Sequence, residues 1–257
     1  MLTEVRGLVI RTVDIKETDR LITVFTEEMG VVTALARGAR SLKSRKMAAT
    51  MQFCYSNLVL YKHGDKYSVR EAELIESFFD IRASIDGLAL AGYIAEVLSY
   101  VTVAEAERDL LRLSLNSLYA ISRSKYSLEK IKAGFEIRAA SILGFMPDVL
   151  SCNRCRETHG DFFFDIMGGI IECAACRSEA TKSGELPQDP HEARILCVLS
   201  EGAKTALGYC VHAPLEKLFS FKISDDDMRL FTRAAEEYIL NQLGRSYKSL
   251  DFYKSVR

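Results

Sequence analysis

Residues 152–176 read CNRCRETHGDFFFDIMGGIIECAAC, and this stretch decides how the middle of the chain folds. It holds two Cys-x-x-Cys pairs separated by seventeen residues, and Gly168-Gly169 divides the apolar part between them into a short predicted hairpin. A hairpin brings the second cysteine turn beside the first, and four thiolates then close a tetrahedron around zinc without an open position for a substrate. The stretch therefore predicts one structural zinc ion, with redox or incidental cysteines as the alternative; the ligands are Cys152, Cys155, Cys173 and Cys176.

The segments on both sides of this stretch have apolar residues at helical spacing. Ser127 and Ser224 are suitable N-caps, and three aspartates after Ser224 suit the positive end of a helix dipole. Gly144, followed by Pro147, is a helix stop. The pattern predicts helices over 81–103, 104–123 and 128–144 before the cysteines, and over 193–207 and 225–243 after them.

The first 80 residues are β-rich, because β-branched and apolar residues alternate with polar turns. Five short strands in this length indicate a small barrel or sandwich, and both an OB-fold and an SH3-like barrel fit the count. The strands are expected over 8–13, 21–26, 31–36, 53–61 and 67–75.

Composition limits the class of protein. The chain has 257 residues, of which 48% are hydrophobic and 27% charged, as in a soluble protein with a sizeable core. Seven cysteines, four of them clustered, predict a reducing compartment, and Cys54, Cys197 and Cys210 lie in apolar runs that predict burial. The N-terminus lacks the apolar run of a signal peptide and no stretch is suited to a bilayer, so we expect a cytoplasmic protein without membrane contact.

The net charge of −1 argues against a surface that coats nucleic acid everywhere, so any contact has to come from a local patch. No acidic residue occurs between Glu28 and Asp65, and residues 37–46 read RGARSLKSRK. Such a flexible basic loop can follow phosphates and release counterions, while Phe53, Tyr55 and Tyr61 could stack bases. The alternative is a solvated charge run beside core aromatics. The candidate DNA contacts are Arg37, Arg40, Lys43, Arg45 and Lys46.

Enzyme signatures are missing from the sequence. It has no Gly-x-x-x-x-Gly-Lys-Ser/Thr loop, and His191-Glu192 is not followed by a second histidine at the metalloprotease spacing. No His-x-Glu accompanies the cysteine pairs, as a zinc deaminase would need. We therefore expect a protein without catalytic activity.

Several short motifs occur in one order along the chain, and together they resemble the bacterial RecO-type DNA repair proteins over essentially the whole length. The motifs are ETDRL at 17–21, VFTEE at 24–28, RGAR at 37–40, REAELI at 70–75, FEIR at 135–138, LGFMPD at 143–148, GG at 168–169 and LGRSYKS at 243–249. Each is weak alone, but their joint order and spacing are specific.

The resemblance implies an α+β multidomain protein. An N-terminal OB-fold β-barrel at 1–80 would bind DNA, a mainly helical domain would occupy 81–150 and 181–257, and an inserted four-cysteine zinc module would occupy 151–180. It also implies binding of single- and double-stranded DNA, annealing of complementary strands, and recombinational repair in the cytoplasm, at the nucleoid when the protein acts. Such proteins work with RecR, and in some settings RecF, to load RecA onto strands coated by single-strand-binding protein (SSB). The family's basic barrel face carries over to the loop cations named above, with Arg11 and Arg70 as further members.

The resemblance further implies a groove in the helical domain for the acidic, apolar-ended tail of SSB. Arg138 is the candidate for holding the tail carboxylate, and an intramolecular ion pair is the alternative for this residue. Two rival functions remain open at this point. The chain could be a zinc-ribbon module that binds only proteins, or a zinc hydrolase with an unfamiliar site.

Overall fold

The computed structural model describes residues 1–100, 107–183 and 194–257, and the chain forms two compact units. Unit 1 comprises Met1–Lys125 together with Tyr247–Arg257, and unit 2 comprises Tyr126–Ser246. The boundaries expected at residues 80, 150 and 180 divide the chain into smaller domains than these two units, and they stay predictions. None of the described helices is long and apolar enough to cross a membrane.

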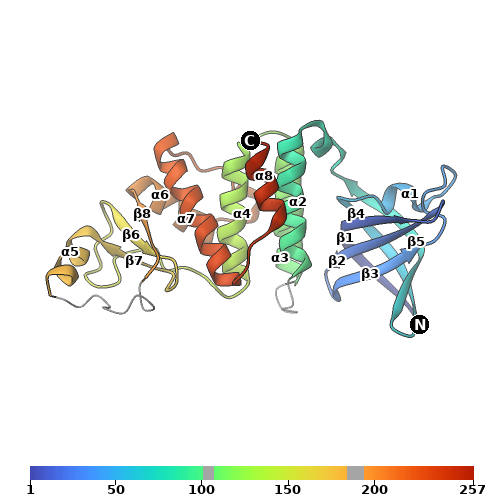
Figure 1. Ribbon diagram of the computed structural model, residues 1–257, viewed down its shortest axis with the longest axis horizontal. Helices are drawn as coiled ribbons and strands as arrows, with labels where there is room; N and C mark the ends of the chain where they lie inside the picture. Colours follow the sequence, from blue (N-terminus) through green and yellow to red (C-terminus); the bar gives the residue numbers. More distant parts are fainter. Residues whose placement is uncertain (101–106, 184–193) are drawn as a thin grey trace. The chain divides into compact units, whose positions relative to one another are not determined.

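Unit 1 begins with a closed barrel of five strands (Figure 1). Their order around the barrel is β1-β2-β3-β5-β4, and neighbours are antiparallel except β3 and β5. This is the five-stranded barrel of an OB-fold, so the predicted OB-fold is confirmed. The strands are β1 (Leu2–Ile15), β2 (Asp19–Thr26), β3 (Gly30–Ala36), β4 (Cys54–His63) and β5 (Lys66–Ser77), and the short helix α1 (Lys46–Ala49) precedes β4.

The sheet closes because β1 pairs with both β2 and β4 and β3 pairs with β5, and alternation along each strand turns one face inward. Along β4, Leu58 and Leu60 are buried, whereas their neighbours Val59 and Tyr61 lie on the outer face. The inward residues of all five strands fill one apolar core. Phe53, just before β4, is also buried, so it belongs to the interior.

Three α-helices and a short 3₁₀ helix complete the described part of unit 1. A short 3₁₀ helix (Phe79–Ala83) leads from the barrel to α2 (Ile85–Ser99), and α3 (Glu107–Ser122) follows; both α2 and α3 contact β1. The last helix, α8 (Lys248–Ser255), returns to pack on α2. There the main-chain N–H of Ser249 donates to Glu96 Oε2 at 2.9 Å, and the ring of Tyr247 meets that of Tyr93 edge to face.

Unit 2 is built around α4 (Leu128–Ile142), α6 (Glu201–His212) and α7 (Asp225–Leu243). The predicted caps are confirmed, because the hydroxyls of Ser127 and Ser224 accept main-chain N–H groups of Lys130 and Asp227. The predicted helices at 81–103, 104–123 and 128–144 correspond to α2, α3 and α4, with residues 101–106 outside the described part. The helix predicted at 225–243 has the bounds of α7.

The helix predicted over 193–207 is wrong in its first part, while Ala193 lies outside the described residues. Residues Leu196–Leu199 form strand β8, which extends the hairpin of β6 (Phe162–Asp165) and β7 (Ile170–Cys173) into a sheet of order β7-β6-β8. These residues form a strand and not a helix because pairing with β6 buries the side chains of Cys197 and Leu199. Helix α6 begins only at Glu201, capped by Ser200.

A buried ion-pair cluster lies in the helical core of unit 2. Lys132 Nζ lies 2.8 Å from Glu136 Oε1 and 2.7 Å from Glu236 Oε2, and the Lys132 and Glu136 side chains are only 2% and 0% exposed. Burial lowers the pKa of Lys132, but the two carboxylates outweigh it and raise the pKa above its ordinary value. This lysine therefore stays charged in the folded protein.

Candidate metal centre and nucleic-acid interface

The four cysteines of the two Cys-x-x-Cys pairs meet in one place. Cys152 and Cys155 lie in a turn before β6, Cys173 ends β7, and Cys176 lies in the first turn of α5 (Ala174–Lys182). Their sulfur atoms all lie within 4.8 Å of one another, and Cys155 is the exposed member. Cys155 Sγ and Cys173 Sγ are 3.6 Å apart, far beyond a disulfide bond of about 2.05 Å but close to the separation of about 3.8 Å expected between two sulfurs on one zinc ion.

Main-chain N–H groups orient these sulfurs. The N–H of Cys173 donates to Cys152 Sγ at 3.3 Å, and the N–H of Cys176 donates to Cys173 Sγ at 3.5 Å. Burial alone would raise the pKa of Cys152, but N–H groups of Cys155, Cys173 and Arg154 lower it to about 6. Burial raises the pKa of Cys173, and the neighbouring sulfur of Cys155 raises that of Cys176, so these two sulfurs need a cation beside them to become thiolates. The spacing of the four sulfurs fits one metal ion held entirely by sulfur.

On the barrel, three of the predicted DNA contacts converge on one groove. Arg37, Lys46 and Arg70 line a groove of about 710 Å³ together with Tyr61 and Tyr67. The guanidinium of Arg70 lies 4.6 Å from the centre of the Tyr61 ring. The groove therefore combines cations with aromatic faces, as sites for single-stranded nucleic acid do.

The groove also contains two basic side chains that the sequence reasoning did not select. His63 and Lys66 line it from the two ends of the β4–β5 turn. Their position beside Gly64-Asp65 was the available signal, since a hairpin turn places its flanking residues at the rim of a barrel. Conversely, Tyr55 lies elsewhere on β4, where its hydroxyl donates to Glu27 Oε1 at 3.0 Å.

The basic loop at 37–46 is exposed, but its base is fixed by Arg40. This guanidinium donates to the carbonyl oxygens of Lys16 and Glu17 at 2.9 and 3.1 Å, and it lies 3.2 Å from Asp14 Oδ2. The main-chain N–H of Gly38 donates to Asp19 Oδ1 at 2.8 Å. Arg40 therefore anchors the loop to the β1–β2 turn, while Arg37, Lys43 and Arg45 are further exposed cations of the loop.

The comparison with known families decides the identity. A model described as Recombination protein O N terminal matches residues 1–78, and one described as Recombination protein O C terminal matches residues 82–251. The chain belongs to the RecO family. The resemblance inferred from the motifs is thereby confirmed, and RecO membership supports a role in recombinational repair.

Curated relatives with the RecO name align over nearly the whole chain. The DNA repair protein RecO of Acetivibrio thermocellus is 36% identical over 252 residues, covering 97% of this chain and 95% of the relative. Those of Desulforamulus reducens and Clostridium novyi are both 31% identical, covering 97% and 98% of this chain and 94% and 93% of the relatives.

Arg11 and Arg138 of this RecO-family chain line neither the groove nor the set of cysteines. Arg11 is exposed on β1, opposite Thr23 of β2. Arg138 lies on α4, where its Nε donates to the carbonyl of Cys210 at 2.7 Å and its Nη2 donates to the carbonyl of Ala213. It thus caps the C-terminal end of α6, and its partner-binding role stays a prediction.

Proposed function

We propose that this RecO-family chain binds single- and double-stranded DNA through its barrel and anneals complementary strands. The observation that carries the proposal is the convergence of Arg37, Lys46 and Arg70 with Tyr61 and Tyr67 in one groove. Cations beside phosphates release counterions, and tyrosine rings stack bases of any sequence. Arg11, Lys43 and Arg45 extend the cationic surface beyond the groove, and Arg40 holds the loop in position.

Annealing needs two strands that approach closely while their bases remain free to pair. Exposed loop cations screen the repulsion between phosphates without fixing the bases. The free energy comes from base pairing, so the proposal requires no nucleotide hydrolysis and no covalent step. In the cytoplasm, the protein would act as a recombination mediator. Together with RecR, and in some settings RecF, it would load RecA onto strands coated by SSB.

The metal in this proposal is a single zinc ion with a structural role. A set of four thiolates suits zinc, and a closed set leaves no position for substrate, unlike the zinc hydrolase alternative. The SSB tail is proposed to bind the helical domain near Arg138. Nε and Nη2 of that residue donate to carbonyl oxygens at the C-terminal end of α6, so a tail carboxylate would have to reach Nη1.

The experiment that tests the cationic surface beside the groove removes two exposed loop cations. The variant Lys43→Ala/Arg45→Ala is compared with Arg112→Ala/Arg229→Ala, which loses the same charge from exposed helical ion pairs. Binding of fluorescent single-stranded DNA is titrated at several salt concentrations by anisotropy, and annealing is followed in parallel. Each lost phosphate contact on a single strand should lower the salt slope by about 0.7, so the loop variant should lose roughly 1.4.

We expect the control variant to bind and anneal like the wild type. If the loop variant and the wild type have equal affinity and equal salt slope, the loop does not contact DNA. Absence of any DNA binding by the wild-type protein would favour the protein-only zinc-ribbon alternative.

A further inference from the structure

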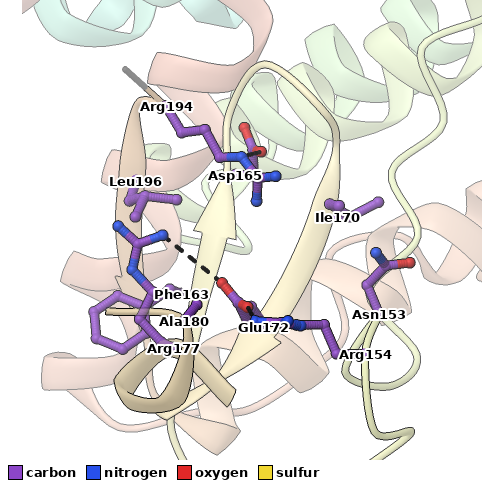
Figure 2. Close-up of a pocket in the computed structure, with 10 residues that line it drawn as sticks. All are labelled: Asn153, Arg154, Phe163, Asp165, Ile170, Glu172, Arg177, Ala180, Arg194 and Leu196. Carbon is purple, nitrogen blue, oxygen red and sulfur yellow. Dashed lines mark hydrogen bonds and ion pairs between the residues drawn. The ribbon is translucent and has the colours of Figure 1, made fainter. Parts of the chain in front are cut away.

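The outer face of the three-stranded sheet in unit 2 forms the floor of a pocket. The register pairs Phe163 with Glu172, and Asp165 with both Ile170 and Leu196, so these five side chains share one face. All five line a pocket of about 260 Å³ (Figure 2). The opposite face of the sheet is buried, so this is the face on which a ligand can be received.

Three arginines from separate segments converge on this pocket. Arg154 comes from the first cysteine turn, Arg177 directly follows Cys176, and Arg194 precedes β8. Their side chains are 39%, 22% and 48% exposed, so the guanidinium groups lie at the pocket surface. Three cations around two carboxylates give the pocket a net positive charge.

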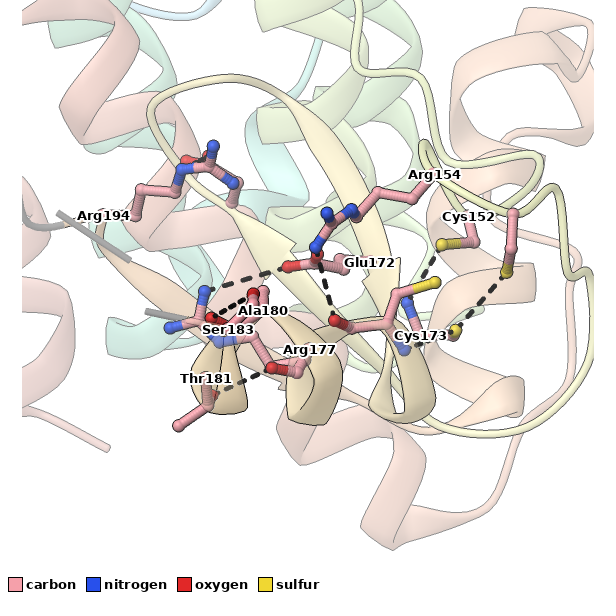
Figure 3. A network of polar contacts seen from close by, with 12 residues as sticks. Cys152, Arg154, Glu172, Cys173, Arg177, Ala180, Thr181, Ser183 and Arg194 are labelled. Atoms are coloured by element: carbon pink, nitrogen blue, oxygen red, sulfur yellow. Dashed lines mark hydrogen bonds and ion pairs between the residues drawn. The ribbon is translucent and has the colours of Figure 1, made fainter. Parts of the chain in front are cut away.

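The long ion pairs of Arg177 and Arg194 allow these two guanidinium groups to contact an anion as well. Arg154 and Arg177 lie 3.5 and 3.8 Å from the carboxylate of Glu172, and Arg194 lies 3.5 Å from Asp165. Arg154 Nη1 also donates to the carbonyl of Cys176 at 3.4 Å. Figure 3 shows Arg154 and Arg177 on either side of Glu172. These distances exceed the usual range of about 2.7–3.2 Å for a strong N–H···O bond. Asp165 also accepts the main-chain N–H groups of two following residues at 3.0 Å, so its charge is stabilised without the arginine.

We propose that this pocket binds one nucleotide of a single nucleic-acid strand, with the phosphate on the guanidinium groups and the base against Phe163. Planar guanidinium groups match the geometry of phosphate oxygens, and an aromatic ring accepts any base by stacking. The proposal rests on the DNA-binding function proposed above and adds a second strand contact, on unit 2. Two contacts on one chain suit a protein that brings two strands together.

The position of the arginines ties this pocket to the metal centre. Arg154 stands between Cys152 and Cys155, and Arg177 is the residue after Cys176. Ordering of the two cysteine turns by the metal therefore also positions two of the three cations. Loss of zinc should weaken strand binding at the pocket even though no ligand of the metal touches the strand.

The test uses the full zinc-loaded chain and avoids residues next to the cysteines. Arg194→Ala and Phe163→Leu are each introduced into the Lys43→Ala/Arg45→Ala background, and Arg229→Ala in the same background is the matched loss of one exposed cation. Binding of a fluorescein-labelled oligothymidine is measured by anisotropy. We expect roughly tenfold weaker binding for each pocket variant, from the loss of a charged hydrogen bond or a stacked base, and no change for the control. Circular dichroism and zinc content verify the fold.

A crosslinking measurement keeps the two proposals separate. A 5-iodouracil oligonucleotide should crosslink to the peptide containing Phe163 in the wild type and in the loop variant alike. Wild-type affinity in both pocket variants, or absence of that crosslink, overturns the pocket whatever the loop variant does. Binding at the pocket of an oligoglutamate peptide but not of the oligothymidine also overturns it, because the ligand is then an acidic protein segment. If the loop variant binds oligothymidine with wild-type affinity while the pocket variants bind it more weakly, the barrel loop is not a DNA contact and the pocket is.

Discussion

Replacement of Lys132 by methionine should strongly destabilise the helical part of unit 2. The ammonium lies 2.8 and 2.7 Å from two carboxylates, and Glu136 is 0% exposed. Methionine keeps the length of the side chain, so it creates little cavity, but it leaves Glu136 buried without its cation. Breaking a buried pair from one side costs about 3–5 kcal/mol, which is a large share of the stability of an ordinary domain.

The loss can be measured by urea unfolding and by the thermal midpoint. For a protein of this size, about 3–5 kcal/mol corresponds to a fall of roughly 6–20 °C in Tm. Because the raised pKa of Lys132 keeps the lysine charged, its stabilising contribution is fully present below the unfolded pKa of about 10.4 and is lost only as the pH rises through the folded value. The wild-type contribution should therefore be constant from about pH 6 to about pH 9.

The matched variants separate charge from packing. Glu136→Gln added to Lys132→Met should recover at least about 2 kcal/mol, because the buried charge is then gone. Lys182→Met, at an exposed position on α5, should change the free energy of unfolding by less than about 0.5 kcal/mol. A Lys132→Met protein within about 1 kcal/mol of the wild type at neutral pH, or one that Glu136→Gln does not rescue, would refute this account.

Three further outcomes are expected. Metal analysis should find about one zinc per chain, and Cys152→Ser should lower both the zinc content and the thermal stability. Gly169→Ala should cost about 2 kcal/mol by urea unfolding, because φ is +64° and the new Cβ would lie 2.6 Å from the Tyr238 hydroxyl, and Tyr238→Phe should relieve part of this loss. Burial and the Glu237 carboxylate raise the pKa of Cys197 to about 12, so iodoacetamide at about pH 8 should leave this thiol unmodified in the folded protein by mass spectrometry.

The elements that the sequence predicted well are those whose signals are local. The five barrel strands follow from alternation, and α7 follows from its cap at Ser224 and its helical period. The meeting of the four cysteines also follows from local spacing, because a hairpin of this length has few ways to place its ends.

Features that depend on contacts distant in sequence were missed. Strand β8 is too short to show a period, and only its pairing with β6 makes it a strand. Arg40 reads as one cation among five, yet its partners Lys16 and Glu17 come from the preceding turn of the barrel. The convergence of Arg154 with Arg194 also depends on the sheet register, which the pattern of residues does not specify.

The packing of α8 on α2 has a consequence for the order in which the protein folds. Unit 1 is discontinuous in sequence, since Tyr247–Arg257 completes a unit whose other residues end at Lys125. During translation, all of Tyr126–Ser246 leaves the ribosome before the last helix can reach Glu96. While unit 2 is synthesised, the barrel and α2 are therefore already outside the ribosome, and the face of α2 that binds α8 stays exposed to solvent. The nascent chain is exposed to aggregation at that face until α8 has emerged.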